Sequence, residues 1–176
     1  MRNYDLITPE GTKDLLFGEC IIRRDIENTL LDLFKSRGYC EMITPGLEFF
    51  DVFNLNSQYF PQENLYKLTD SKGRLLVMRP DSTMPIARVV ATRLRDAVLP
   101  LKLCYNQPVY STEPALKGRS DEIVQAGIEL IGSQLKMADL EVISTAADSL
   151  KSFGMEFSLE IGHIGIFKEL VGRLDA

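Results

Sequence analysis

The chain has 176 residues, 45% of them hydrophobic, and a formal net charge of −5. This length suits one domain with a buried core, and the acidic balance gives no support to a basic nucleic-acid-binding surface. No apolar run approaches the ~20 residues of a membrane span, and the first residues lack the apolar region of a signal peptide, so we expect a cytoplasmic protein.

The chemistry-bearing residues do not form a metal site. Cys20, Cys40 and Cys104 are odd in number, widely spaced and flanked by apolar residues, so we expect reduced packing cysteines. The single histidine, His163, follows an apolar run without a paired nucleophile or carboxylate motif, which is typical of a structural histidine. We therefore expect no metal and no other cofactor.

A helix and a short strand are predicted after the turn-rich segment Thr8–Asp14. Apolar residues recur at three- and four-residue intervals through Glu19–Arg37, which predicts an amphipathic helix, and Gly38 suits its left-handed cap. The run Tyr39–Pro45 then predicts a strand that ends at proline.

A hairpin is predicted from two short runs, Leu65–Asp70 and Arg74–Met78. Its second strand leads into Arg79-Pro80-Asp81-Ser82-Thr83, and a helix is predicted from about Met84 to Leu94. The first turn of a helix exposes unpaired N–H donors, so polar ligands often bind there. Composition alone also allows Asp81 or Ser82 to be an ordinary helix cap.

The centre of the chain predicts an antiparallel ribbon. Two β-like runs, Leu103–Tyr110 and Glu122–Ile131, flank a polar loop that is too long for a tight turn. The charged and glycine residues of this loop are Glu113, Lys117, Gly118, Arg119 and Asp121.

Alternation along the second run separates two faces. Val124, Ala126, Ile128 and Leu130 predict a core face, whereas the other face carries a glutamine and a glutamate about 13 Å apart with Gly127 between them. Such a face has room for a small ligand against the backbone. The alternative is a solvated sheet face with a bulge at the glycine.

Three elements are predicted after the ribbon. The pattern favours a helix from about Ala138 to Phe153, a further strand at Met155–Ile161 and a last helix at Ile164–Leu174.

The central run resembles motif 2 of class II aminoacyl-tRNA synthetases, and within that class it is similar to the histidyl-tRNA synthetases. The matching positions are Tyr105, Pro108, Glu113, Lys117, Gly118, Arg119, Gln125, Gly127 and Glu129. The helix, strand and proline up to Pro45 resemble motif 1, and Pro9–Asp14 resembles the family's amino-terminal segment. Residues 79–83 resemble the family's Arg-Pro-Glu-x-Thr, with Asp81 one methylene shorter than the glutamate.

Two departures concern nucleotide binding. The motif 2 arginine that contacts the ATP α-phosphate in the synthetases falls on Ser111, which offers only a neutral hydroxyl. The aromatic residue that stacks on adenine falls on Ile123. Amino-acid positions are kept while nucleotide positions are not, and this pattern resembles the regulatory subunits of ATP phosphoribosyltransferase.

The resemblance implies an α+β fold of the class II synthetase type, with a mostly antiparallel sheet flanked by helices. Residues 1–176 would be the amino-terminal portion of a single domain whose carboxyl-terminal part is missing. The implied histidine-binding residues are Asp81, Thr83, Gln125 and Glu129, and the pocket edge comprises Tyr105, Ser111, Arg119 and Gly127.

The resemblance also implies a function without catalytic residues. The subunit would activate the short catalytic subunit of ATP phosphoribosyltransferase and transmit feedback inhibition by L-histidine in histidine biosynthesis. It would form a homodimer through the motif 1-like region, with apolar surface around Leu47, Phe49, Phe50, Val52 and Phe53 between subunits. An ordinary strand and helix buried within one chain remain the alternative for that region, and tRNA is not an expected partner.

Three other functions remain open from the sequence. The first is a catalytic-core fragment of histidyl-tRNA synthetase, which would activate histidine with ATP and charge tRNA. The second is a synthetase-like binding module for another amino acid or partner. The third is a structural dimerisation domain in which Gln125 and Glu129 affect only stability.

Overall fold

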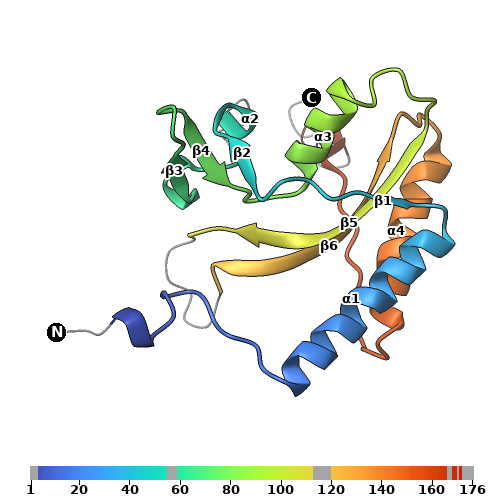
Figure 1. The fold of residues 1–176 in the computed structure, drawn as a ribbon. Coiled ribbons are helices and arrows are strands. Elements are labelled where there is room, and N and C mark those ends of the chain that lie inside the picture. The colour runs from blue at the N-terminus through green and yellow to red at the C-terminus, as the bar shows by residue number, and fades with distance from the viewer. Residues whose placement is uncertain (1–3, 55–58, 113–119, 166–167, 170, 172–176) are drawn as a thin grey trace.

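Two small sheets and four α-helices make up the computed structural model, which describes residues 4–54, 59–112, 120–165, 168–169 and 171 (Figure 1). In chain order the elements are η1 (Tyr4–Leu6), α1 (Gly18–Ser36), β1 (Cys40–Glu41), β2 (Leu47–Phe49), α2 (Asp51–Asn54), η2 (Gln62–Asn64), β3 (Lys67–Thr69), β4 (Leu75–Met78), α3 (Thr83–Thr92), β5 (Leu101–Tyr110), β6 (Glu122–Ile131) and α4 (Lys136–Lys151). The α+β architecture agrees with the sequence prediction.

The larger sheet has the strand order β1-β5-β6. Its long ribbon pairs β5 and β6 antiparallel from Leu101↔Ile131 to Tyr110↔Glu122, and β1 lies parallel to β5. The predicted ribbon is therefore confirmed: β6 has the predicted bounds, and β5 begins two residues earlier than predicted.

Helices cover both faces of this ribbon, with α3 above it and α1 below it in Figure 1. On the α1 side, Phe34, Tyr39 and Cys104 form a buried cluster. The partly buried residues packed on it are Leu30, Leu31, Ala126, Ile128 and Leu130. The predicted core face of β6 is thus confirmed for Ala126, Ile128 and Leu130, which pack on this cluster.

The other long helix, α4, is joined to the end of α1 by polar contacts. Arg37 pairs with Asp148 and donates a hydrogen bond to Thr145 Oγ1 at 2.7 Å. Tyr39 donates to Glu141 at 2.9 Å, and Lys102 of β5 pairs with the same carboxylate at 2.7 Å. These contacts fix α4 against both α1 and the ribbon.

The smaller sheet has the order β2-β4-β3 and is antiparallel throughout. Its β3–β4 hairpin confirms the hairpin predicted around residues 71–73. The inner side packs on a cluster of Phe53, Leu65 and Val77, all less than 9% exposed. Phe53 is 0% exposed, so its ring belongs to the core of this chain, and a subunit contact for some of the apolar surface around it stays a prediction.

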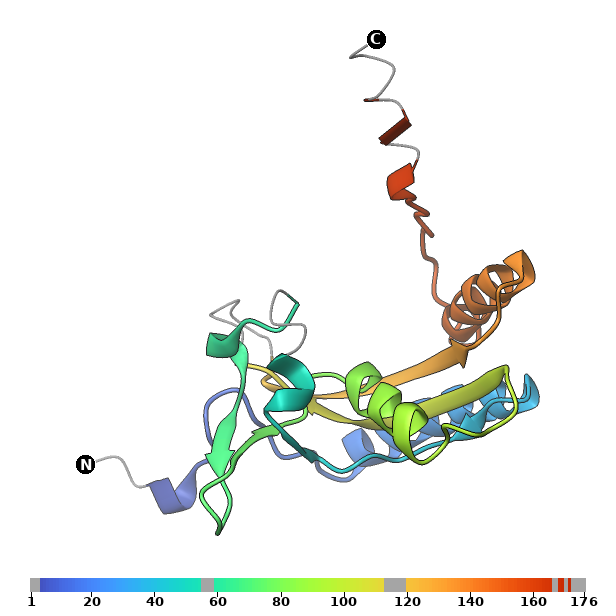
Figure 2. The ribbon, with the colours of Figure 1, turned by 90° about the horizontal axis from the view of Figure 1, so that it is seen from above.

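The prediction of a strand at Met155–Ile161 is wrong. These residues have no assigned secondary structure, and Figure 2 shows this part of the chain running away from the two sheets. Met155 is 59% exposed and Ile161 is 72% exposed. The residues do alternate between apolar and polar, but no described strand pairs with this segment. Alternation alone does not make a strand without a neighbouring strand to hydrogen-bond with it. Of the predicted helix 164–174, the described positions 164–165, 168–169 and 171 are helical.

Among the described residues, no helix is both long and apolar enough to cross a bilayer. No group of three or more His, Cys, Asp or Glu side chains in the same ranges has the proximity that a metal ion needs.

A buried arginine joins the two sheets. Arg79, 2% exposed, follows β4, and its Nη1 donates to the carbonyl oxygens of Thr44 at 2.7 Å and Pro45 at 2.9 Å. Its Nη2 and Nε donate to the carbonyl oxygen of Pro108 in β5 at 2.6 and 3.1 Å. The guanidinium therefore connects the segment after β1, the end of β4 and the carboxyl-terminal part of β5.

The main chain of Arg79 forms hydrogen bonds to the same two regions of the chain, the segment after β1 and strand β5. Its N–H donates to the carbonyl of Gly46, and its carbonyl accepts from the N–H of Tyr110, both at 2.9 Å. Burial lowers the pKa of Arg79, against the opposing effects of Tyr110 and Glu48. The buried guanidinium is nevertheless stable here, because each of its three nitrogens donates to an oxygen acceptor.

We expect Arg79→Met to lower the free energy of unfolding by about 3 kcal/mol or more, because it leaves several buried carbonyl oxygens without donors. Urea unfolding followed by circular dichroism measures this change. The control is Arg24→Met, whose side chain is 77% exposed and should matter by less than about 1 kcal/mol. Equal losses for the two variants would contradict the role assigned to Arg79.

Candidate functional site

Four predicted site residues meet where α3 begins against the face of β6: Asp81, Thr83, Gln125 and Glu129. The hydroxyl of Thr83 donates to Glu129 Oε1 at 2.8 Å, and Gln125 Nε2 donates to Asp81 Oδ2 at 3.3 Å. The structure therefore brings all four side chains into one hydrogen-bonded cluster, which we call the acidic site.

The sequence places these side chains through two simple rules. Gln125 and Glu129 lie four residues apart in a strand, so both project from the same face of β6. Asp81 and Thr83 stand at the start of α3, where main-chain N–H groups need acceptors. The Thr83 N–H donates to Asp81 Oδ1 at 2.7 Å, so Asp81 also acts as the cap that its composition suggested.

Ser82 is the part of the site that sequence reasoning missed. Its side chain is 0% exposed, and its main-chain N–H donates to Gln125 Oε1 at 3.2 Å. Both ends of the Gln125 amide are thus held by the loop before α3. A backbone donor carries no residue-type signal, so this contact could be found only from the structure.

The space above Gly127 is filled by the protein itself. Tyr105 pairs with Gly127 across the ribbon, and a Cβ atom at position 127 would lie 2.5 Å from the Tyr105 hydroxyl oxygen. The expectation that a ligand lies there against the backbone is therefore wrong. Pairing the two predicted strands would have given the signal, because a large side chain opposite a glycine leans over it.

Burial shapes the electrostatics of the acidic site. Burial, and to a smaller extent the nearby charge of Asp81, raise the pKa of Glu129, although the Thr83 hydrogen bond opposes this shift. Burial together with the charges of Glu129 and Asp81 raises the pKa of Tyr105 to about 12. Among the described residues, no Lys or Arg forms an ion pair with either carboxylate. The site therefore favours a ligand that brings a positive charge.

The remaining predicted residues lie at or beyond the edge of the described site. Ser111 directly follows β5 and is half-buried, with its N–H donating to the Asp121 carbonyl at 2.9 Å. Ile123 is 53% exposed on the same strand face as Gln125. The prediction for Arg119 lies outside the described residues, as do those for Glu113, Lys117 and Gly118.

The base of the ribbon loop is tied to the amino-terminal segment. The Asp121 N–H donates to the Gly11 carbonyl at 2.7 Å, and Tyr66, which directly precedes β3, donates to the Asp121 carboxylate at 2.5 Å. This hydrogen bond, followed by burial, raises the pKa of Tyr66 to about 12. Gly11 has a φ of +77°, and a Cβ there would lie 2.3 Å from the Asp121 carboxyl carbon. A glycine is required at this point of close approach.

A cavity of about 840 Å³ lies on the other side of the ribbon, between α1 and the sheet. Its lining includes Arg23, Glu27 and Ile26 of α1, and Asn106 and Ala126 of the ribbon. None of the four acidic-site residues lines it.

Comparison with known sequences gives one family. The family described as histidyl-tRNA synthetase matches residues 11–176. The ATP phosphoribosyltransferase regulatory subunit of Clostridium kluyveri is 48% identical over 172 residues, which cover 97% of this chain and 44% of that protein. The protein of that name from Clostridium acetobutylicum is 46% identical, over 97% of this chain and 42% of that protein. The chain thus spans less than half of the length of these curated relatives.

Solved structures agree on the fold. An ATP phosphoribosyltransferase regulatory subunit/histidyl-tRNA synthetase from Bacillus halodurans is similar with a TM-score of 0.79 and 34% identity, covering 88% of this chain and 40% of that chain. The apo histidyl-tRNA synthetase of S. aureus gives 0.73 and 27% identity, covering 86% and 35%. The expected class II synthetase-like fold is confirmed.

We expect Gly127→Ala to destabilise the protein by about 1–3 kcal/mol, because the added methyl overlaps the Tyr105 ring. The loss should shrink when Tyr105→Leu removes the overlapping atoms, which a double-mutant cycle of urea midpoints measures. Gly46→Ala is the matched control, since a Cβ there meets nothing within 4 Å. A Gly127→Ala loss that persists unchanged in the Tyr105→Leu background would contradict this packing.

We expect Glu129→Gln to raise the free energy of unfolding at pH 7. A carboxyl whose folded pKa is raised lowers stability once it is ionised, and glutamine removes this penalty while keeping an acceptor for Thr83. The advantage should disappear as the pH falls through the folded pKa to below the ordinary value of 4.5, where both side chains are neutral. Urea unfolding across this pH range measures the difference, and an advantage that grows toward low pH would refute it.

Proposed function

Because this chain belongs to the histidyl-tRNA synthetase family, we propose that it is part of a histidine-binding regulatory subunit of ATP phosphoribosyltransferase. The subunit is non-catalytic. It is required for the activity of the short catalytic subunit and for feedback inhibition by L-histidine at the first step of histidine biosynthesis. The names of the Clostridium relatives, at 46–48% identity over nearly the whole chain, support this assignment.

The observation that carries the proposal is the acidic site. Asp81 and Glu129 lie on either side of Thr83, with no cation paired to them in the described part of the chain. The ammonium group of an amino acid supplies the missing charge, and the Gln125 amide adds a donor and an acceptor. The ligand lies over the Tyr105 ring, since the ring closes off the backbone at Gly127.

A residue at the edge of the site separates this function from aminoacylation. Ser111 stands where the synthetases have the arginine that contacts the α-phosphate of ATP. A neutral hydroxyl cannot replace a charged, bidentate guanidinium next to a developing phosphoryl charge. The protein therefore holds histidine without activating it, and it acts in the cytoplasm with no tRNA as partner.

The subunit also pairs with a second copy through the motif 1-like region. Leu47 and Phe49 of β2 remain 47% and 44% exposed and are close to this region in sequence. They form the outer face of the small sheet, opposite to the buried Glu48. An apolar strand face of this kind is suited to a subunit contact.

Feedback inhibition requires unequal affinities. Histidine can shift the assembly toward an inactive state only if it binds that state more tightly than the active one. The acidic site supplies the affinity for histidine, and the assembly with the catalytic subunit supplies the two states.

We expect Asp81→Asn and Glu129→Gln each to weaken histidine binding by the full-length protein by about 10- to 100-fold, the effect of losing one charge-assisted hydrogen bond. Isothermal titration calorimetry with histidine and other amino acids measures the change. Asp96→Asn removes the same charge from a side chain that is 93% exposed and should bind as the wild type does. A wild-type protein that shows no preference for histidine would end the site assignment.

The regulatory role has a direct assay. Adding full-length protein to the short catalytic subunit should raise phosphoribosyltransferase activity, and histidine should lower it again. Activity that stays unchanged in both steps would refute the role. Histidine-dependent ATP–pyrophosphate exchange by the full-length protein would favour a working synthetase instead.

A further inference from the structure

The start of α3 is held by the same atoms that face the ligand of the acidic site. Asp81 Oδ1 accepts from the Thr83 N–H, Gln125 Oε1 accepts from the Ser82 N–H, and Glu129 Oε1 accepts from the Thr83 hydroxyl. An ammonium group that binds here competes with three restraints on one helix end. Occupancy of the site therefore changes the forces on α3.

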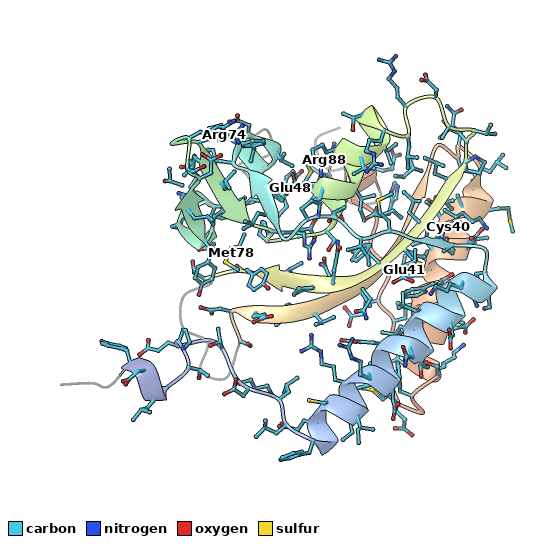
Figure 3. All side chains as sticks on the ribbon, in the orientation of Figure 1. Cys40, Glu41, Glu48, Arg74, Met78 and Arg88 are labelled. Atoms are coloured by element: carbon cyan, nitrogen blue, oxygen red, sulfur yellow. The ribbon has the colours of Figure 1, made fainter. Side chains whose placement is uncertain are left out.

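The other side of α3 is joined to the small sheet. Arg88 lies five residues beyond Thr83 and pairs with Glu48 of β2 through two hydrogen bonds, at 3.0 and 2.5 Å (Figure 3). Glu48 is 6% exposed and Arg88 is 34% exposed, so the carboxylate is shielded from solvent, and the two parallel hydrogen bonds define the geometry of the pair. A shift of α3 is transmitted to β2 at this contact.

Strand β2 has a different environment on each face. Glu48 points inward, whereas its neighbours Leu47 and Phe49 point outward and are 47% and 44% exposed. Any movement of the Glu48 main chain moves these two apolar side chains with it, because all three belong to one short strand. The exposed face of β2 is therefore mechanically connected to the acidic site.

We propose that α3 and the Arg88–Glu48 pair couple occupancy of the acidic site to the exposed apolar face of β2. This inference rests on the proposed function and adds the route by which a bound amino acid changes a subunit contact. Between the two ends, α3 is a firm connection: Pro85 and Ile86 are fully buried, and Ile86 packs on Leu103 and Tyr105. The pair touches no ligand and acts only by positioning α3 relative to β2.

The test cuts this connection without leaving a buried charge. The double variant Glu48→Gln with Arg88→Met removes both charges, which is better tolerated than the loss of one partner. The matched control is Lys35→Met with Glu41→Gln, an ion pair of 2.7 Å between α1 and β1. Both variants are made in the full-length protein and assembled with the short catalytic subunit.

Three measurements separate coupling from binding and from stability. Calorimetry gives the histidine affinity, hydrogen exchange of peptides spanning 47–50 and 82–92 gives the response of β2 and α3, and the activity assay gives the histidine concentration for half inhibition. In the wild type and in the control variant, histidine should alter exchange in both peptides. In the Glu48/Arg88 variant we expect affinity within about threefold of wild type, an unchanged 47–50 peptide, and about tenfold more histidine for half inhibition.

Each other result is decisive. Normal inhibition and a normal response of β2 in the Glu48/Arg88 variant would overturn the coupling while leaving the proposed function intact. If the Glu48/Arg88 variant loses histidine affinity and histidine inhibition to the same extent, the pair acts in binding. This result would also overturn the coupling while leaving the proposed function intact. A wild-type protein without any heat of histidine binding would refute the proposed function itself, and the coupling with it.

Discussion

The position of Arg79 is the constraint on which the rest of the structure depends. Its guanidinium is buried, and its hydrogen-bond partners are neutral oxygens of Thr44, Pro45 and Pro108, which belong to separate stretches of the chain. Neutral oxygens make the hydrogen bonds to this charge, and the Glu48 carboxylate favours it only through space, so the arrangement depends on geometry more than on ion pairing. Because Asp81 is only two residues further along, the same junction that unites the two sheets also determines where the acidic site is built.

Under the proposed function, the small set of contacts in the acidic site serves both structure and recognition. Asp81 caps α3, Gln125 orients the loop before it, and Thr83 offsets part of the desolvation of Glu129 through a hydrogen bond. These bonds give each of the two carboxylates a hydrogen-bond donor, whereas the buried Ser82 hydroxyl has no hydrogen-bond partner among the described residues.

Periodicity was enough to predict the elements whose partners are local in sequence. The helix before Gly38, the hairpin around residues 71–73 and the ribbon all followed from apolar spacing and turn residues. The ring of Tyr105 over Gly127 could have been found by pairing the two predicted strands. Other contacts between distant segments could not be predicted, because the backbone donor at Ser82 and the carbonyls around Arg79 carry no residue-type pattern. The prediction of a strand at Met155–Ile161 was wrong for the same reason. Alternation of apolar and polar residues indicates which side chains share a face, but it does not show whether another strand pairs with the segment.

The contact between Gly11 and Asp121 has a practical consequence for work with the purified protein. Residues near the amino terminus are commonly treated as a neutral place for an affinity tag, but here the eleventh residue abuts the carboxylate that anchors the ribbon loop. A fusion partner or a trimmed start that pulls on this segment would disturb the loop base, which lies far along the sequence. Tags are better placed elsewhere, or separated by a long flexible spacer that leaves the first turn of the chain undisturbed.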